Sequence, residues 1–211
     1  MQIYHQVTRQ FQTNTYLLYD EATKDAVWID PGERIAAVEQ KIESEGLILR
    51  KILLTHGHGD HIGAAEYYRE KYQCVIGCYI GEKEMMEDPS LNLTQEMGLG
   101  AISLKCDEFY TDGQRIQPFD LQVWFTPGHT SGSCCFQWND VIFCGDLIFQ
   151  GAVGRWDLPT GNFTHLMSSF QRILNKKGNY RLLSGHGEET STQIELQSNP
   201  FVRYAQRFSD R

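Results

Sequence analysis

The segment LLTHGHGDHIGAA, residues 53–65, brings together side chains that can bind metal ions. Within six positions it holds three imidazoles and one carboxylate, those of His56, His58, Asp60 and His61. On an extended segment, residues two apart point to the same side, so His56 and His58 can reach one ion. Asp60 and His61 come next, where a turn can aim both at a second ion, and the intervening glycines let the backbone wrap tightly. The spacing therefore predicts a site for more than one metal ion.

Three later segments repeat one pattern, in which an apolar run and a glycine precede a single side chain that can bind a metal. These segments are FTPGHT with His129, FCGDL with Asp146 and LSGHG with His186. Taken singly, an HxH pair is often an accident of the surface, and a Gly-Asp pair after a strand is usually a turn. Together the patterns hold five of the seven histidines of the chain, which favours one shared site. The other two, His5 and His165, are interpreted as structural or surface residues.

The composition argues against several classes of partner. The chain has 211 residues, of which 41% are hydrophobic and 22% charged, as in an ordinary globular protein. Its formal charge is −8, from 27 acidic and 19 basic residues. Nucleic acid is therefore not expected as a partner, because phosphate binding relies on clustered Lys and Arg. A membrane-spanning helix is not expected either, since no window approaches about 18 consecutive apolar residues.

The cysteines and the amino-terminal stretch indicate a compartment. The stretch MQIYHQVTRQF lacks the apolar run behind basic residues that marks a secretion signal. The six cysteines form no CxxC pair, which argues against a thiolate zinc site. Without a secretion signal they are expected to be free thiols, buried as small hydrophobic side chains. These observations predict a cytoplasmic protein.

The pattern of apolar residues predicts strands and helices in alternation. Strands are expected at 14–20, 26–30, 51–56, 74–79, 119–128, 134–138, 141–146 and 180–185. Helices are expected at 34–46, 64–72, 163–177 and 190–197. Residues 81–106 predict a short helix broken by Pro89 and then mostly loop. The order indicates sheets sandwiched between helices, with a site where the strands end.

With these motifs the chain resembles the metallo-β-lactamase superfamily, from about residue 14 to residue 187. The resemblance rests on HxHxDH followed by single His, Asp and His residues at strand ends. Within the superfamily the chain is most similar to the small glyoxalase II-like hydrolases, on the segments GDLIFQGAVGRWDLPTGN and GHGEETST. The resemblance implies an α/β fold, a four-layer αββα sandwich, in a single domain over residues 1–211. It also implies an enzyme, a thioesterase similar to hydroxyacylglutathione hydrolase.

The resemblance further implies a binuclear metal centre. One ion would be bound by His56, His58 and His129, the other by Asp60, His61 and His186, and Asp146 would bridge both. Zinc is the expected metal at both positions, with iron or manganese as alternatives, because imidazole suits Zn and Fe whereas carboxylates favour harder ions. A hydroxide bridging the ions would attack the acyl carbon of a small-molecule thioester. This assigns catalytic roles to Asp60 and Asp146.

Two further residues carry two interpretations each. Asp30, in WIDPG, matches a family aspartate that supports a metal ligand from behind, and it is also interpreted as a turn aspartate before proline. Arg155 resembles an arginine of the small glyoxalase-like proteins, where its fork of donors could clamp a substrate carboxylate. The same arginine could instead form an ordinary salt bridge with Asp157.

Other functions compete for the same ligands. The persulfide dioxygenases also resemble this chain, including the Gly154–Asp157 pattern, and would use a single iron held by His56, His129 and Asp146 as a facial triad. This alternative stays open because both families share nearly the same ligands. An RNA-processing nuclease predicts a basic surface that the sequence lacks, and a β-lactamase predicts an export signal and a cysteine at the position of Asp146. A structural zinc site needs only four ligands.

The thiol of the substrate stays open as well. Longer glyoxalase II enzymes carry a helical C-terminal domain with basic residues for glutathione. Here only 25 residues follow His186 (211 − 186). We therefore expect either a different thiol or a looser glutathione site.

Overall fold

The computed structural model describes residues 1–206, and the chain divides into two compact units. The first unit comprises residues 1–78 and 83–110, and the second comprises residues 79–82 and the chain from Thr111 onward. Each unit is built on one six-stranded sheet. The expectation of a single domain over residues 1–211 stays a prediction.

The sheet of the first unit has the strand order β1-β2-β3-β4-β5-β6. Its strands are β1 (Gln2–Val7), β2 (Asn14–Tyr19), β3 (Asp25–Ile29), β4 (Ile48–Leu54), β5 (Val75–Tyr79) and β6 (Glu108–Tyr110). The first three pair antiparallel, whereas β3, β4 and β5 pair parallel. Parallel strands end at the same edge of a sheet, so the turns that follow β3 and β4 lie next to each other.

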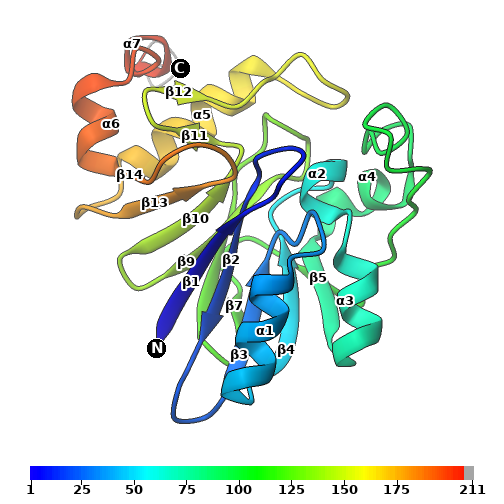
Figure 1. Ribbon diagram of the computed structural model, residues 1–211. Helices are drawn as coiled ribbons and strands as arrows, with labels where there is room; N and C mark the ends of the chain where they lie inside the picture. Colours follow the sequence, from blue (N-terminus) through cyan, green and yellow to red (C-terminus); the bar gives the residue numbers. More distant parts are fainter. Residues whose placement is uncertain (207–211) are drawn as a thin grey trace. The chain divides into compact units, whose positions relative to one another are not determined.

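Helices of the first unit cover one face of this sheet (Figure 1). They are α1 (Ala36–Glu45) and α3 (Ala65–Tyr72), whereas the single-turn α2 (Gly59–Ile62) and α4 (Lys83–Glu87) lie beyond the ends of the strands. The core between helices and sheet packs Ile42 of α1 and Tyr68 of α3 against Trp28 and Ile52 of the strands. Full burial of such side chains stabilises by about 1.5–3 kcal/mol each. Gly46 ends α1 in the left-handed conformation, at φ 64°.

The sheet of the second unit has the strand order β14-β13-β10-β9-β8-β7. Its strands are β7 (Arg115–Ile116), β8 (Leu121–Phe125), β9 (Cys134–Trp138), β10 (Val141–Gly145), β13 (Arg181–Ser184) and β14 (Thr190–Ser191). A separate hairpin consists of β11 (Ile148–Phe149) and β12 (Ala152–Val153). Because β9 pairs antiparallel with both β8 and β10, and β10 pairs parallel with β13, three strands end at the same edge: β8, β10 and β13.

Helix α5 (Phe163–Leu174) covers this second sheet. Asn162 begins the helix by accepting a hydrogen bond from the backbone N–H of His165 at 2.9 Å. Its buried face packs Leu166, Phe170 and Ile173 against the strands. The other helices of this unit are the short 3-10 helix η1 (Ile80–Glu82), α6 (Thr192–Ser198) and α7 (Val202–Ala205).

The expected elements all occur, with ends that differ by up to three residues, and several elements were missed. The expected helix at 190–197 begins as β14 and becomes α6 only at Thr192. The missed elements are β1, β6, β7, the hairpin of β11 and β12, and the short helices α2, η1 and α7. His5 and His165 are exposed, as expected.

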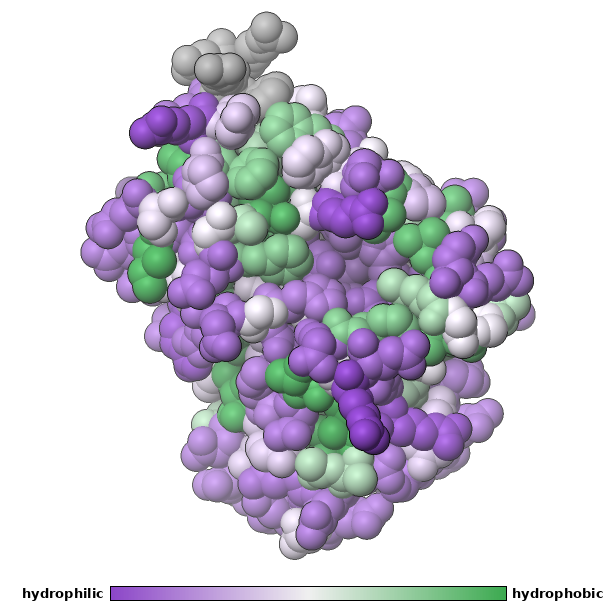
Figure 2. All heavy atoms as spheres, turned by 45° about the horizontal axis from the view of Figure 1, so that its top comes forward, coloured by the Kyte–Doolittle hydropathy of each residue, from purple (hydrophilic) through white to green (hydrophobic). Residues whose placement is uncertain are grey.

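None of the six cysteines forms a disulfide bond, as expected. Five are buried and Cys106 is half-buried. Among residues 1–206, none of the helices combines the length and the apolar character that crossing a membrane requires. The face drawn in Figure 2 is mostly hydrophilic, with its hydrophobic residues in small groups.

Candidate metal centre

The candidate ligands of the first unit lie directly after β4, in its connection to α2 and in α2 itself. All four are buried: His56 is 1% exposed, His58 2%, Asp60 6% and His61 0%. The ring centroid of His56 lies 4.8 Å from that of His58 and 4.1 Å from that of His61. Buried imidazoles this close would repel one another if protonated. A shared cation would instead be attracted to their lone pairs.

Two glycines hold the turn after β3 against α2. A Cβ atom on Gly32 would lie 1.6 Å from the carbonyl oxygen of Asp60, and one on Gly63 would lie 2.4 Å from the carbonyl oxygen of Gly32. Only glycine permits backbones to approach so closely. The turn that carries Asp30 and the helix that carries Asp60 are therefore in fixed contact.

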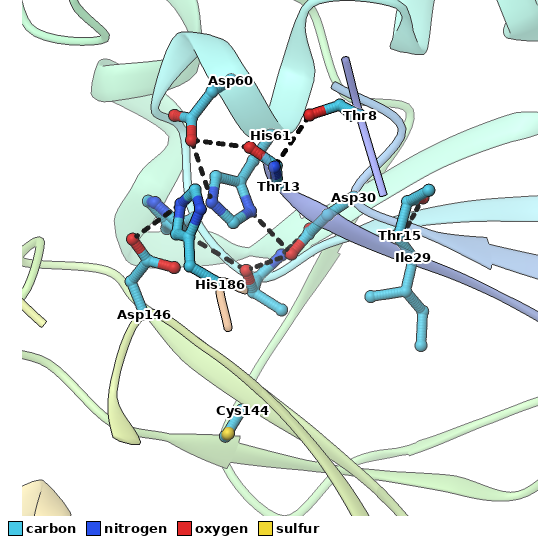
Figure 3. A network of polar contacts seen from close by, with 12 residues as sticks. Thr8, Thr13, Thr15, Ile29, Asp30, Asp60, His61, Cys144, Asp146 and His186 are labelled. Carbon is cyan, nitrogen blue, oxygen red and sulfur yellow. Dashed lines mark hydrogen bonds and ion pairs between the residues drawn. The ribbon is translucent and has the colours of Figure 1, made fainter. Parts of the chain in front are cut away.

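Asp30 makes the contacts of a residue that orients metal ligands (Figure 3). It is 2% exposed, and its Oδ2 accepts hydrogen bonds from Nδ1 of His61 at 2.9 Å and from the hydroxyl of Thr55 at 2.6 Å. Because the Thr55 hydroxyl donates to Asp30, it accepts from Nδ1 of His56, 3.1 Å away. Both imidazoles therefore carry their proton on Nδ1, which leaves Nε2 as the ligand atom. Asp30 also lies in a turn before Pro31 in the left-handed conformation, at φ 52°, and its support of a metal ligand stays a prediction.

We expect Asp30→Ala to weaken metal binding by roughly 10- to 100-fold, the usual cost of losing a partner of a ligating histidine. It also leaves the backbone N–H of Thr55 and Nδ1 of His61 without their buried acceptor, which costs about 3 kcal/mol of unfolding free energy. Competition with a chelator measures the first effect and chemical denaturation the second. Asp25→Ala is the matched control, because the Asp25–Arg50 pair lies at the surface of the same unit. Equal metal affinity in the two variants would contradict the role of Asp30.

Asp60 is held by a threonine that the sequence did not point to. The hydroxyl of Thr13 donates to Oδ2 of Asp60 at 2.9 Å, and the backbone N–H of Thr13 donates to the hydroxyl of Thr8 at 2.8 Å (Figure 3). The same Oδ2 lies 3.5 Å from Nε2 of His61. One oxygen of Asp60 is thus fixed beside the ligand atom of its neighbour.

The candidate ligands of the second unit follow β8, β10 and β13, the three strands that end at one edge of the sheet. Oδ2 of Asp146 lies 3.5 Å from Nε2 of His129 and 3.6 Å from Nε2 of His186; Figure 3 shows the contact with His186. His129 is 3% exposed, whereas the side chain of His186 is 30% exposed. The carboxylate of Asp146 therefore lies within reach of both imidazoles, as a bridging ligand must.

The backbone after β12 orients His129. Its Nδ1 donates to the carbonyl oxygen of Arg155 at 2.7 Å, so Nε2 is again the ligand atom. A Cβ atom on Gly154 would lie 1.8 Å from the carbonyl oxygen of Asp146 and 3.3 Å from Nδ1 of His129. Only a glycine at 154 allows the chain to pass this close to both ligands.

The side chain of Arg155 is paired within its own loop. Its Nε and Nη2 donate to the two carboxylate oxygens of Asp157, each at 2.9 Å, and the two side chains are 66% and 62% exposed. This is the salt bridge that the sequence suggested as one of two interpretations. An exposed pair of this kind adds little to stability. The contact that Arg155 makes with a candidate ligand comes from its backbone carbonyl.

The donor atoms of both units fit divalent metal ions. His56, His61 and His129 each have Nδ1 engaged as a donor, which leaves a lone pair on Nε2. Oδ2 of Asp60 lies 3.5 Å from Nε2 of His61, and Oδ2 of Asp146 lies 3.5 Å from Nε2 of His129. Two ligands of one metal ion lie about this far apart. Imidazole together with carboxylate suits Zn, Fe and Mn. The chemistry of the donor set is therefore that of a transition-metal site.

The buried cysteines are poor nucleophiles. Burial raises the pKa of Cys74 to about 11 and that of Cys135 to about 12, and it raises the pKa of Cys144 well above the usual value of a thiol. These three thiols are protonated at neutral pH, and a thiol attacks only as its thiolate. Their packing in the two cores agrees with the interpretation as small hydrophobic side chains.

Relatives of this chain align with nearly all of it. The probable metallo-hydrolase YqgX of Bacillus subtilis (strain 168) is 36% identical over 197 residues, which are 90% of this chain and 92% of YqgX. The hydroxyacylglutathione hydrolase GloC of Haemophilus influenzae is 33% identical over 199 residues, which are 91% of this chain and 93% of GloC.

Solved structures match the fold at similar coverage. The crystal structure of the BLEG-1 B3 metallo-beta-lactamase has a TM-score of 0.88 at 33% identity, and covers 95% of this chain and 99% of its own. The di-iron-bound form of TTHA1623 has a TM-score of 0.84 at 31% identity and covers 94% and 99%. ETHE1 from Myxococcus xanthus has a TM-score of 0.78 at 27% identity and covers 99% and 88%. The α/β fold that the motifs implied is confirmed.

The profile of the metallo-beta-lactamase superfamily matches residues 8–186. The match includes strands β2 to β13, Asp30 and every candidate ligand from His56 to His186. Family profile, relatives and solved structures therefore agree, and the chain belongs to the metallo-beta-lactamase superfamily.

Proposed function

We propose that the chain is a metal-dependent hydrolase that cleaves a small hydroxyacyl thioester. The observation that carries the proposal is the carboxylate of Asp146, whose Oδ2 lies 3.5 Å from His129 and 3.6 Å from His186. A carboxylate within reach of two separate imidazoles is suited to join two ions, and two ions about 3.5–4 Å apart are the usual arrangement in binuclear hydrolases.

The proposed ligand sets combine side chains of both units. We assign His56, His58 and His129 to one ion, Asp60, His61 and His186 to the other, and Asp146 to both. Neither unit alone supplies enough ligands for two ions, which is the reason to combine them. Zinc is the proposed metal, and iron is a second candidate because TTHA1623 was crystallised in a di-iron-bound form. Manganese would suit the ion with two carboxylate ligands.

Each residue has a defined task in the proposed reaction. The metal ions, when bound, would lower the pKa of a water molecule and polarise the thioester carbonyl. Asp60 and Asp146 would contact the reacting centre, and the Thr13 hydroxyl holds Oδ2 of Asp60 in one orientation. Asp30 orients the imidazole of His61, and the carbonyl of Arg155 orients that of His129, so that Nε2 is the atom left to bind a metal ion. Fixing these groups before the substrate arrives lowers the cost of reorganisation during the reaction.

The substrate class follows from relatives. GloC, which is 33% identical, is named a hydroxyacylglutathione hydrolase, and YqgX, which is 36% identical, a probable metallo-hydrolase. We propose a hydroxyacyl thioester for this chain on that likeness, with the thiol left to experiment. The Nε and Nη2 donors of Arg155 are bonded to Asp157, so the two-donor clamp on a substrate carboxylate through these atoms would need that pair to separate.

A second candidate function is that of an iron-dependent oxidoreductase similar to persulfide dioxygenases. The likeness to ETHE1, at 27% identity over 99% of this chain, is the observation in its favour. One iron would then be held by His56, His129 and Asp146. The likeness to a B3 metallo-beta-lactamase adds β-lactams to the substrates to be tested.

One experiment separates these functions. The purified chain is loaded with zinc, manganese or iron, its metal content is measured, and each form is assayed with hydroxyacyl thioesters, glutathione persulfide and a chromogenic cephalosporin. Two metals per chain with thioester turnover support the proposal. One iron per chain with oxygen consumption on persulfide overturns it in favour of the second candidate. Turnover of the cephalosporin alone overturns both.

Removal of the metal should abolish hydrolysis. We expect dialysis against a strong chelator to lower the rate by roughly 10³-fold or more, because the chain then has no means of activating water at neutral pH. Circular dichroism should show that the two sheets remain. Rates restored by stoichiometric zinc would identify it as sufficient, whereas full activity in chelated protein of proven low metal content would contradict a metal-dependent reaction.

A further inference from the structure

A fully buried carboxylate in the second unit, that of Glu195 on α6, takes no part in the proposed reaction. It is 0% exposed. Its Oε1 accepts a hydrogen bond from the hydroxyl of Thr190 at 2.6 Å, and its Oε2 accepts from the backbone N–H of Gly151 at 3.0 Å and from Nδ2 of Asn199 at 2.7 Å. Burying a carboxylate is costly unless hydrogen bonds replace its water. These three donors therefore hold Glu195 firmly in one position.

Glu195 and Asn199 form hydrogen bonds with the turn and the second strand of the β11–β12 hairpin. While Gly151 donates to Glu195, the carbonyl oxygen of Ala152 accepts from Nδ2 of Asn199 at 3.0 Å. A hairpin with only two residues in each strand is not stable alone. Its position therefore depends on contacts with the rest of the unit, which are the burial of Ile148 and Val153 in the core and these hydrogen bonds with Glu195 and Asn199.

The hairpin and the two residues that follow it contact each candidate ligand of the second unit. Phe149 of β11 packs edge-on against His186, with ring centroids 6.0 Å apart. After β12, Gly154 lies against the backbone of Asp146, and Arg155 accepts the hydrogen bond of His129. One short segment thus contacts three ligands that come from three different strands.

Glu195 also reaches the strand that leads to His186. Thr190, which donates to Oε1, pairs with Leu182 of β13. Strand β13 ends at Ser184, two residues before His186. The same carboxylate is therefore connected to the hairpin through Oε2 and to this strand through Oε1.

We infer that Glu195 is a positioning residue for the metal ligands of the second unit, and that it acts through the β11–β12 hairpin. The inference rests on the proposed function, because it concerns ligands of the proposed metal centre. Glu195 touches no ligand itself. It sets the position of the backbone that orients His129 and of the phenyl ring that packs on His186.

The test measures cobalt(II) binding to the full chain by its visible absorption spectrum and by competition with a chelator. We expect Glu195→Ala to bind cobalt roughly 10- to 100-fold more weakly, with a changed spectrum, as do variants that lose a partner of a metal ligand. Glu195→Gln should stay close to the wild-type protein. Its amide oxygen can accept from Gly151 and Asn199, and its amide nitrogen can donate to Thr190 once that hydroxyl turns.

Ser191→Ala is the matched control. The hydroxyl of Ser191 caps α6 by accepting from the N–H of Ile194 at 3.3 Å, and it contacts neither Glu195 nor the hairpin. This variant should lower the melting temperature and leave the cobalt spectrum unchanged. If Glu195→Ala does the same, Glu195 supports only the fold and the inference is overturned.

Two further outcomes are distinguishable. If Glu195→Ala does not fold, Glu195→Asp carries the test, because it keeps the charge and draws the carboxylate back by one methylene group from the N–H of Gly151. Wild-type cobalt affinity in that variant overturns the inference. A wild-type chain that binds no cobalt overturns the proposed function together with this inference, whereas normal binding in Glu195→Ala overturns this inference alone.

Discussion

Asp146→Asn is expected to lower kcat/KM for thioester hydrolysis by roughly 10³-fold or more. The substitution keeps the size of the side chain and removes its negative charge. That charge lies 3.5 Å and 3.6 Å from the ligand nitrogens of His129 and His186. A neutral amide binds a cation far more weakly than a carboxylate does, so the two metal ions would lose their bridging ligand. Steady-state kinetics and metal content per chain measure the two consequences.

The fold should survive this substitution. The backbone on both sides of Asp146 is held by its own hydrogen bonds, from Gly185 N–H to the Gly145 oxygen at 2.8 Å and from Gly154 N–H to the Leu147 oxygen at 3.4 Å. Neither bond involves the side chain of Asp146. We therefore expect a melting temperature close to that of the metal-free wild-type protein.

Asp157→Asn is the control for charge alone. Asp157 is an exposed carboxylate of the same unit, and its bond to Arg155 is a surface pair worth about 0–1 kcal/mol. A rate within about fivefold of wild type is expected. A changed KM in this variant would indicate that Arg155, once released, contacts the substrate. Near-normal rates and two bound metals in Asp146→Asn would show that Asp146 is not the bridge.

The elements that the sequence predicted are those whose burial leaves a strong pattern. Strands β2 and β10 are buried along their whole length, and each contains a run of apolar residues, YLLY in β2 and VIFC in β10. Strand β1 was missed because QIYHQV lies at the edge of its sheet and is mostly exposed or half-buried, so polar residues interrupt its pattern. Helix α2 has four residues, too few to show a helical period.

The candidate ligands could be predicted because each follows a strand, and a strand end is a local signal. Of the groups that hold them, Asp30 was named through the family resemblance, and the others could not be predicted. Thr13 is 47 positions from Asp60 in the sequence, and the sheet brings them together only after folding. The group that orients His129 is a backbone carbonyl, which every residue has and no sequence pattern can mark.

Gly154→Ala is the second change for which a large effect is expected. The added Cβ would lie 1.8 Å from the carbonyl oxygen of Asp146, so one of the two backbones must move by more than an ångström. Such overpacking costs about 1–3 kcal/mol or more of unfolding free energy. Since the carbonyl of Arg155 would move with residue 154, His129 would also lose its orienting bond. We expect metal affinity to fall at least tenfold, measured by chelator competition beside thermal unfolding.

Gly151→Ala is the control that distinguishes loss of metal through a displaced ligand from loss of stability through a strained backbone. Gly151 is in the same hairpin segment at φ +70°, and a Cβ there would have no atom within 4 Å. Its substitution costs about 1–2 kcal/mol through the left-handed conformation, yet it keeps the N–H that donates to Glu195. If both variants lose stability and only Gly154→Ala loses metal, the close approach to Asp146 and His129 is the cause. If Gly154→Ala binds metal as the wild-type protein does, that approach has no part in positioning the ligands, and the hydrogen bond from His129 to Arg155 is dispensable.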